Sequence, residues 1–113
     1  MNGQCLCQKI KISVPTTSEK ISGCYCDWCR KWSNGAFLCL QEGYSEDAIV
    51  EGKEFLQEFM SSKEASRTFC KNCGTNISFK YDKHYFNVGL FDDRIFKVIE
   101  QPYSEEKKPD YLK

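Results

Sequence analysis

Seven of the eight cysteines in this 113-residue chain fall into three short clusters, and thiolates at such spacings converge on soft metal ions. In chain order, the clusters are Cys5 and Cys7, then Cys24, Cys26 and Cys29, then Cys70 and Cys73. Zn²⁺ is the first ion to consider. A structural zinc site is closed by four protein ligands, whereas a catalytic site keeps three and leaves one position open. Four plus three sulfurs would supply one site of each kind.

The last cluster has the geometry of a zinc knuckle, in which Cys70 and Cys73 bind one ion and Gly74 supplies a positive φ. Such a half-site needs two more ligands, and Cys5 with Cys7 can supply them. To bind one ion, the sulfurs of Cys5 and Cys7 must converge, and side chains on a regular extended strand do not converge. We therefore expect Cys5 and Cys7 to lie at a bend or bulge.

Spacing alone leaves a second partition open. Cys26 and Cys29 could share one ribbon-type site with Cys70 and Cys73, which would leave the other clustered cysteines spare. Disulfides are a further alternative for an even number of cysteines. The start of the chain lacks the charged and then apolar pattern of a signal peptide, so reduced thiols in a cytoplasmic protein are the expectation.

Short apolar runs between turn residues predict a mainly β fold that positions these clusters. Strands are predicted over residues 8–14, 20–23, 36–40, 55–59, 76–81, 85–90 and 95–99. One helical turn over 27–32 would bring Cys26 and Cys29 onto one side. Turns or loops are predicted over 15–18, 33–35, 43–48 and 61–66, with 43–48 also able to form a short helix. The charged tail over 104–113 is expected to be peripheral.

Composition indicates a single domain over residues 1–113 and argues against two classes of partner. Hydrophobic residues make up 41% of the chain, enough for a modest core. Zinc would add stability, since finger peptides bind it with free energies on the order of 10–16 kcal/mol. The 16 basic and 16 acidic residues cancel, which argues against nucleic-acid binding. No apolar run approaches the length that spans a membrane.

The ordered motifs resemble those of the glutathione-dependent formaldehyde-activating enzyme family, which includes the centromere protein V group. The resemblance lies in Gly3-x-Cys5-x-Cys7, Cys24-x-Cys26-x-x-Cys29-Arg30 and Arg67-x-Phe69-Cys70-x-x-Cys73-Gly74-Thr75. It continues in Lys31-Trp32-Ser33, Gly89-Leu90-Phe91-Asp92-Asp93 and Lys108-Pro109-Asp110-Tyr111. These segments cover nearly the whole chain, and three motifs in the right order are far more specific than one Cys-x-x-Cys pair.

The resemblance implies an Mss4-like β-tent of short antiparallel strands stapled by zinc. It implies a structural zinc held by Cys5, Cys7, Cys70 and Cys73. It also implies a second, labile and catalytic zinc at Cys24, Cys26 and Cys29. By analogy, it selects one of the two partitions that spacing leaves open.

The activity implied by the resemblance is that of a carbon–sulfur lyase that adds glutathione to formaldehyde, giving S-hydroxymethylglutathione. The partner would be a small thiol or thiol adduct, and Arg30, Lys31 and Arg67 are the cations available for its anionic groups. Arg30 and Arg67 could instead support the zinc thiolates. The alternative function is a non-catalytic binding module on the same scaffold, with both zinc sites structural.

Other residues that could do chemistry have simpler interpretations. Cys39 lies in an apolar run and is expected to be a buried hydrophobe. His84 is expected to be an exposed turn histidine rather than a base. Trp28 and Trp32 are four residues apart and are expected to pack in the core, although they could line a pocket beside the second cluster.

Overall fold

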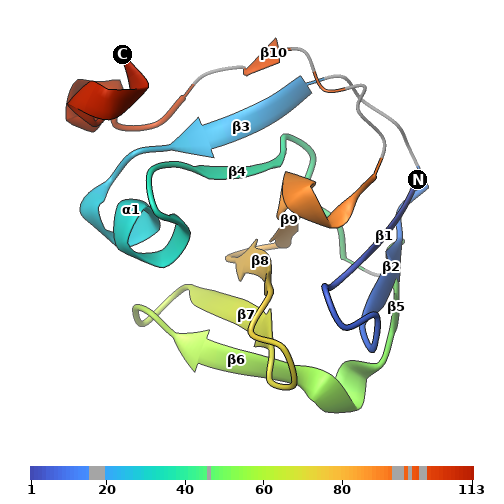
Figure 1. The fold of residues 1–113 in the computed structure, drawn as a ribbon. Coiled ribbons are helices and arrows are strands. Elements are labelled where there is room, and N and C mark those ends of the chain that lie inside the picture. The colour runs from blue at the N-terminus through green and yellow to red at the C-terminus, as the bar shows by residue number, and fades with distance from the viewer. Residues whose placement is uncertain (16–19, 46, 93–95, 97, 100–101) are drawn as a thin grey trace.

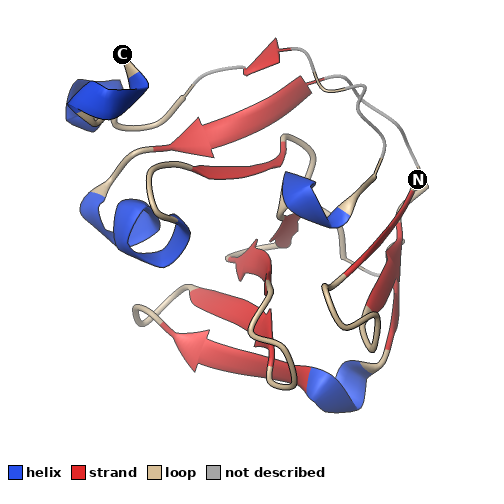
Figure 2. Cartoon of the chain, viewed as in Figure 1, coloured by secondary structure: helices blue, strands red, loops and turns tan. Residues whose placement is uncertain are grey.

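The computed structural model describes residues 1–15, 20–45, 47–92, 96, 98–99 and 102–113. Within these residues the chain forms three small sheets (Figure 1), and strands outweigh helices throughout (Figure 2). All three sheets contribute side chains to one core, including Ile12, Leu40, Ile77 and Phe86. The mainly β fold expected from the sequence is confirmed.

The first sheet has the order β1-β2-β5 and is antiparallel. Its strands are β1 (Asn2–Gln4), β2 (Lys11–Ser13) and β5 (Ile49–Glu51). The predicted strand over 8–14 is shorter than expected because Gln8 has a φ of 67° and belongs to the turn that carries the first two cysteines. β1 was not predicted, since its three residues include no apolar side chain to signal a strand.

The second sheet places β3 in the middle and has the order β10-β3-β4. Its strands are β3 (Lys20–Cys24), β4 (Phe37–Leu40) and β10 (Val98–Ile99). β4 is antiparallel to β3 and β10 is parallel to it. The predictions over 20–23 and 36–40 are confirmed. The strand predicted over 95–99 is confirmed at Val98–Ile99, and part of its range lies outside the described residues, as does most of the turn predicted over 15–18.

The third sheet is antiparallel throughout, in the order β6-β7-β8-β9. Its strands are β6 (Leu56–Met60), β7 (Ser66–Cys70), β8 (Asn76–Lys80) and β9 (His84–Phe86). β6 and the β8–β9 hairpin match the prediction, except that the strand predicted over 85–90 ends at Phe86 and Val88–Leu90 forms a 3₁₀ helix. β7 was missed. β7 has no alternating apolar signal, because Ser66, Arg67 and Thr68 are all buried polar residues. Thr68 Oγ1 bonds Ser78 Oγ at 2.7 Å, which satisfies both buried hydroxyls.

The one α-helix among the described residues is α1 (Asp27–Ser33), and it extends the helical turn predicted at that place. Cys26 caps its start, and Asn34 ends it in the left-handed conformation with a φ of 68°. The 3₁₀ helices are η1 (Lys53–Phe55), η2 (Val88–Leu90), η3 (Glu105–Lys107) and η4 (Asp110–Leu112). The 43–48 segment contains turns, and Glu46 lies outside the described residues. None of the helices described has the length and apolar character to cross a membrane.

The tail over 104–113 is mostly exposed, as expected, and the C-terminal segment is also bonded to the loop around the second cysteine cluster (Figure 1). The backbone N–H of Tyr103 donates to the carbonyl of Gly23 at 2.7 Å, and the N–H of Tyr25 donates to the carbonyl of Tyr103 at 3.0 Å. Further along, Tyr111 donates its hydroxyl to the carbonyl of Asn34 at 2.9 Å. These contacts are made by backbone groups and one hydroxyl, so the charges of the tail did not predict them.

Two glycines with the same backbone conformation allow a matched test of the packing between β1–β2 and η1. Gly52 and Gly74 both have a φ of 82°. A Cβ on Gly52 would overlap the carbonyl of Lys9, whereas a Cβ on Gly74 would meet nothing within 4 Å. We expect Gly74→Ala to cost roughly 1–2 kcal/mol through left-handed strain alone and Gly52→Ala to cost clearly more. Urea unfolding of both variants measures the difference. Equal losses would contradict the steric role of Gly52.

Candidate metal centres

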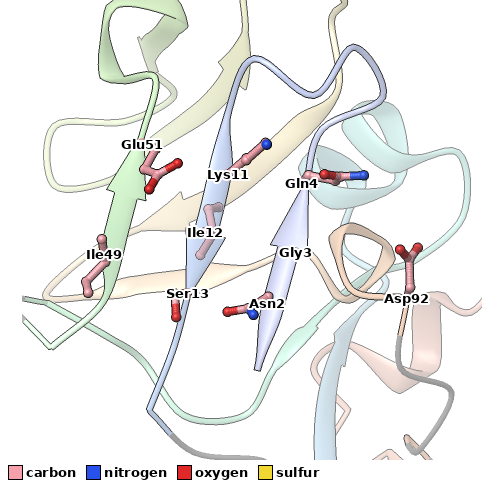
Figure 3. A pocket seen from close by; sticks show the side chains of 9 residues that line it. All are labelled: Asn2, Gly3, Gln4, Lys11, Ile12, Ser13, Ile49, Glu51 and Asp92. Carbon is pink, nitrogen blue, oxygen red and sulfur yellow. The ribbon is translucent and has the colours of Figure 1, made fainter.

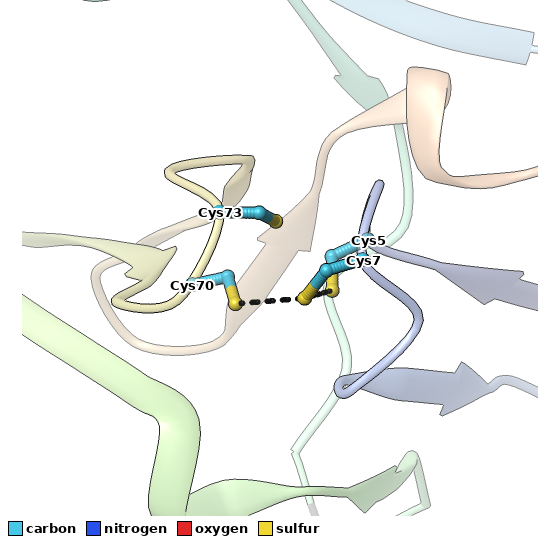
Figure 4. Close-up of side chains that lie close together, drawn as sticks. All are labelled: Cys5, Cys7, Cys70 and Cys73. Carbon is cyan, nitrogen blue, oxygen red and sulfur yellow. Dashed lines mark hydrogen bonds between the residues drawn. The ribbon is translucent and has the colours of Figure 1, made fainter.

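Four sulfurs from two distant parts of the chain meet beside the core (Figure 4). This four-cysteine cluster consists of Cys5 and Cys7, in the turn after β1, with Cys70 at the end of β7 and Cys73 in the next turn. All four Sγ atoms lie within 4.8 Å of one another. The bend expected at the first two cysteines is confirmed, and Gly74 has the positive φ expected of it.

The four-cysteine cluster fits a tetrahedral zinc ion. Zn–S bonds of about 2.3 Å place ligand sulfurs about 3.8 Å apart at the corners of a tetrahedron. The Cys5–Cys7 and Cys7–Cys70 Sγ distances are 3.6 and 3.8 Å. Cys5 and Cys70 are buried, and the N–H of Ile10 donates to Cys5 Sγ at 3.3 Å. A set of four cysteines, two of them buried, that can surround one ion has the features of a structural site.

Hydrogen bonds and burial act in opposite directions on the thiols of this cluster. Burial raises the pKa of Cys70 to about 11. Burial is the largest single effect on Cys73 and opposes its ionisation, but hydrogen bonds involving Thr75 and Cys7 together outweigh it and lower the pKa of that thiol to about 5. The Thr75 hydroxyl lies 3.1 Å from Cys73 Sγ. Metal binding would therefore displace protons from some of these sulfurs, so affinity should fall in acid.

The second group of sulfurs is the three-cysteine cluster of Cys24, Cys26 and Cys29, whose Sγ atoms also lie within 4.8 Å of one another. Cys24 ends β3, Cys26 is the N-cap of α1, and Cys29 lies in the first turn of that helix. The N–H of Cys29 donates to Cys26 Sγ at 3.4 Å. The helical start thus brings the last two sulfurs together, and the end of β3 supplies the third.

The three-cysteine cluster is polarised even without a cation. A hydrogen bond from the Cys29 thiol lowers the pKa of Cys24 to about 5, and the same contact, together with burial, raises the pKa of Cys29. One thiolate therefore stands beside a protonated neighbour at neutral pH. A soft cation would favour ionisation of all three sulfurs.

Arg67 supplies a buried positive charge beside this cluster. Its side chain comes from β7, the residue is 5% exposed, and both terminal nitrogens donate to Cys29 Sγ at 3.7 and 3.8 Å. The rings of Trp32 and Phe79 lie 4.9 and 5.2 Å from the guanidinium carbon. A buried guanidinium is stabilised by nearby negative charge, and the positive charge of Arg67 is one of the causes that lower the pKa of Cys24, the neighbour of Cys29 in the cluster. The surroundings therefore suit a cluster that carries negative charge.

The other two predicted cations lie on the exposed side of α1. Arg30 is partly exposed and lies 3.6 Å from Asp27, while Lys107 of the C-terminal segment lies 3.4 Å from the same carboxylate. The hydrogen bond and charge of Lys107 lower the pKa of Asp27, with a smaller effect from Arg30. Lys31 is exposed at the edge of a cleft. Substrate binding by Arg30, Lys31 and Arg67 remains a prediction.

Cys39 is 7% exposed and packs with Cys29 and Phe37 outside both clusters, so its assignment to the core is confirmed. Burial raises its pKa to about 12, which keeps it protonated. The expectation for Trp28 is wrong, because that residue is 57% exposed. Trp32 is half-buried, with its ring centroid 5.1 Å from that of Phe37.

His84 is not an exposed turn residue as expected. It is half-buried in β9, its Nδ1 lies 2.9 Å from Ser78 Oγ, and its ring stacks on Phe86 with the centroids 5.6 Å apart. Ser78 pairs with Thr68, the strand neighbour of Arg67, so this histidine belongs to the opposite face of the sheet from the three-cysteine cluster. The turn residues before it suggested exposure, but hairpin pairing draws it inward.

Two concave regions of about 360 Å³ differ in their relation to the sulfurs. One lies over β1, β2 and β5 (Figure 3), where Lys11 and Glu51 are paired across neighbouring strands and no cysteine lines the surface. The other is bordered by α1, the end of β6 and β7. Phe59 and Ser61 line it beside Arg67, and neither was a candidate from the sequence. The sequence placed Phe59 in a predicted strand but could not show that its side chain is 62% exposed, which is the property that marks the cleft.

A β scaffold that brings together one four-cysteine and one three-cysteine cluster defines a class of protein with two candidate metal centres. The chain belongs to the glutathione-dependent formaldehyde-activating enzyme family, whose sequence model matches residues 1–106. A Schizosaccharomyces pombe protein named as an uncharacterized lyase is 33% identical over 112 residues, covering 96% of this chain and 80% of that protein. A crystal structure of a Rhodobacter sphaeroides protein matches the fold with a TM-score of 0.71 at 22% identity, over 92% of this chain and all of that one.

The two clusters should respond differently to loss of a single sulfur. If zinc occupies both, Cys70→Ser removes an ion whose binding free energy, on the order of 10–16 kcal/mol, is comparable to the whole stability of a domain. We expect that variant to lose its near-ultraviolet circular dichroism. Cys24→Ser should keep the fold and lose one zinc equivalent by elemental analysis. Retention of the native spectrum by Cys70→Ser, with its full zinc content, would contradict the structural role of the four-cysteine cluster.

His84 should make stability depend on pH. Burial is the main cause that lowers its pKa, with a smaller effect from the charge of Lys80, so its folded value lies below the unfolded value of about 6.5. Its contribution is fully present above that value and is lost as acid protonates the unfolded chain first. Between pH 7.5 and 5.5, the urea midpoint of the wild type should fall further than that of His84→Gln. Metal release affects both proteins alike, so parallel curves would refute this role of His84.

Proposed function

We propose that this chain is a zinc-dependent carbon–sulfur lyase that joins a small thiol, such as glutathione, to formaldehyde. Family membership and the relative named as a lyase support this reaction class. The chemistry of the donors supports zinc, because clustered thiolates select soft or borderline ions. The proposed complement is one structural zinc at the four-cysteine cluster and one labile zinc at the three-cysteine cluster.

The observation that carries the proposal is the incomplete donor set around Cys24, Cys26 and Cys29. Within the described part of the chain, no further cysteine, histidine or carboxylate joins these three sulfurs. Three protein ligands and one position for a substrate or water are what catalytic zinc sites provide. The neighbouring guanidinium of Arg67 would balance the net negative charge of three thiolates around a divalent ion.

A bound zinc ion would accept an incoming thiol and lower its pKa, which makes a nucleophile available at neutral pH. The three cysteines would fix the position of the reacting sulfur, and the hydrogen bonds from Arg67 would hold Cys29 in place. In the reaction, a C–S bond forms as the C=O π bond of the aldehyde opens. The oxygen gains the proton that the thiol gives up, so addition needs no oxidant or reductant.

We also propose a cytoplasmic location, where small thiols are abundant. All eight cysteines are free, including the seven that lie in the two clusters. Reduced thiols are the form that metal binding requires, and reducing compartments maintain it.

The activity test compares two cysteines that differ in their relation to the cluster. We expect zinc-loaded wild type and Cys39→Ala to accelerate formation of S-hydroxymethylglutathione from formaldehyde and glutathione, followed by NMR. Cys26→Ala should lose at least about 100-fold, more than the 10–100-fold typical of residues one shell further from a metal. Equal rates for wild type and Cys26→Ala, both at the uncatalysed level, would favour a non-catalytic zinc-stabilised binding module.

A further inference from the structure

The cleft beside the three-cysteine cluster has walls from two separate parts of the chain. Its lining comes from α1 on one side and from the end of β6 with β7 on the other. The residues are Trp28, Lys31, Trp32, Phe59, Ser61 and Arg67. Its volume is about 360 Å³, which suits one small molecule rather than a peptide chain.

The walls of this cleft are mainly aromatic, and two of them face solvent. Trp28 and Phe59 are 57% and 62% exposed, while Trp32 packs inward against the guanidinium of Arg67. Leaving large aromatic side chains in water forgoes about 25 cal/mol for each Å² of apolar area that burial would remove. Aromatic side chains gathered from two elements at the rim of a cleft are therefore suited to covering an apolar ligand.

The charges of the cleft have one sign. Lys31 and Arg67 line it, and none of its lining residues is acidic. Lys31 is exposed and forms no ion pair within the part of the chain that the structure describes. Arg67 is already engaged with Cys29, which leaves Lys31 as the cation available to a ligand.

Arg67 also connects the cleft to the sulfurs. Its guanidinium lines the cleft and at the same time lies 3.7 Å from Cys29 Sγ. Arg67 is therefore the side chain that the cleft and the three-cysteine cluster share, and it places the two next to each other.

From this juxtaposition we infer that the cleft binds the body of the thiol substrate, and that this thiol is an amphiphilic anion with an aromatic or branched aliphatic group and a carboxylate. The inference rests on the proposed function for the reacting sulfur and adds the class of thiol. The apolar group lies between Trp28 and Phe59, and the carboxylate faces Lys31. Glutathione has carboxylates that could face Lys31 but no such apolar group, so it should occupy this cleft more weakly than a thiol that has both.

The two tryptophans of the chain both line the cleft, so intrinsic fluorescence reports directly on its occupancy. The probes are 3-phenylpropanoate, its neutral amide and glutathione, each titrated into the zinc-loaded protein. We expect saturable quenching by the phenyl acid, about threefold to fivefold weaker binding of the amide, as one exposed charge pair provides, and weaker binding of glutathione than of the phenyl acid. Added salt should reduce the preference for the acid.

Variants separate the two parts of the recognition. Lys31→Gln should give the acid and the amide equal affinities, and Phe59→Ser should weaken the binding of both probes equally. Lys53→Gln on η1 is the matched control and should leave both affinities unchanged. Both cleft residues are exposed, so native circular dichroism is expected throughout. Glutathione binding as tight as that of the phenyl acid, equal binding of acid and amide to the wild type, or an unchanged preference in Lys31→Gln would each overturn the inference.

The phenyl probes contain no sulfur, so their binding does not depend on catalysis. If they bind as expected while thiol addition to formaldehyde is absent, the reaction proposed above fails and the cleft stands. If the reaction occurs but the probes do not bind, the inferred class of thiol fails and the lyase activity stands.

Discussion

The convergence of sulfurs from opposite ends of a long chain segment is the contact on which the rest of the structure depends. Cys7 and Cys70 are 63 residues apart, and their Sγ atoms lie 3.8 Å from each other. Closing so long a loop is entropically costly, and the strands it unites have only two to five residues each. Cys5 and Cys70 are themselves members of the main core, beside Ile12 and Phe86. Cross-linking by an ion at this point would fix the first sheet against the third.

That same contact positions the second cluster through β7. Cys70 ends this strand, and Arg67 lies three residues earlier, with its guanidinium on Cys29. A second contact between this region and α1 follows the Cys70–Cys73 turn, where the side-chain amide of Asn76 donates to the backbone carbonyl of Trp32 at 3.0 Å. The four-cysteine cluster therefore lies at one end of the strand that supplies the charge beside the three-cysteine cluster. The two centres are unequal in ligand number but share one framework.

The sequence was informative where residue type and local spacing decide the outcome. The cysteine grouping, the helical start after Cys26, and the β8–β9 hairpin all follow from short-range geometry. It was uninformative where tertiary contacts override local pattern. β7 is buried with polar side chains whose partners lie on other elements, such as Ser78 on β8 for Thr68 and Cys29 on α1 for Arg67, so periodicity could not reveal it.

Exposure was the least predictable property of the site. Turn residues next to His84 suggested an exposed ring, yet its strand pairing and the contact with Ser78 draw it inward. The spacing of Trp28 and Trp32 indicated one helical face, but spacing does not state whether that face meets the core or a cleft. Composition identified the C-terminal tail as a surface segment, but it did not reveal that Tyr103 pairs with the end of β3.

The brevity of α1 has a consequence for how the three-cysteine cluster can exist at all. The helix has seven residues, well below the roughly 12–15 that an isolated helix needs in water. Its start is capped by Cys26, a cluster member, and its end is held by Asn76 and by Tyr111, which lie far along the chain. The spacing of these sulfurs is thus a property of the folded domain and not of the motif. Unlike the ligand loop of a zinc finger, this cluster is not portable, and transplanting its short sequence to another protein would transfer the cysteines without their geometry.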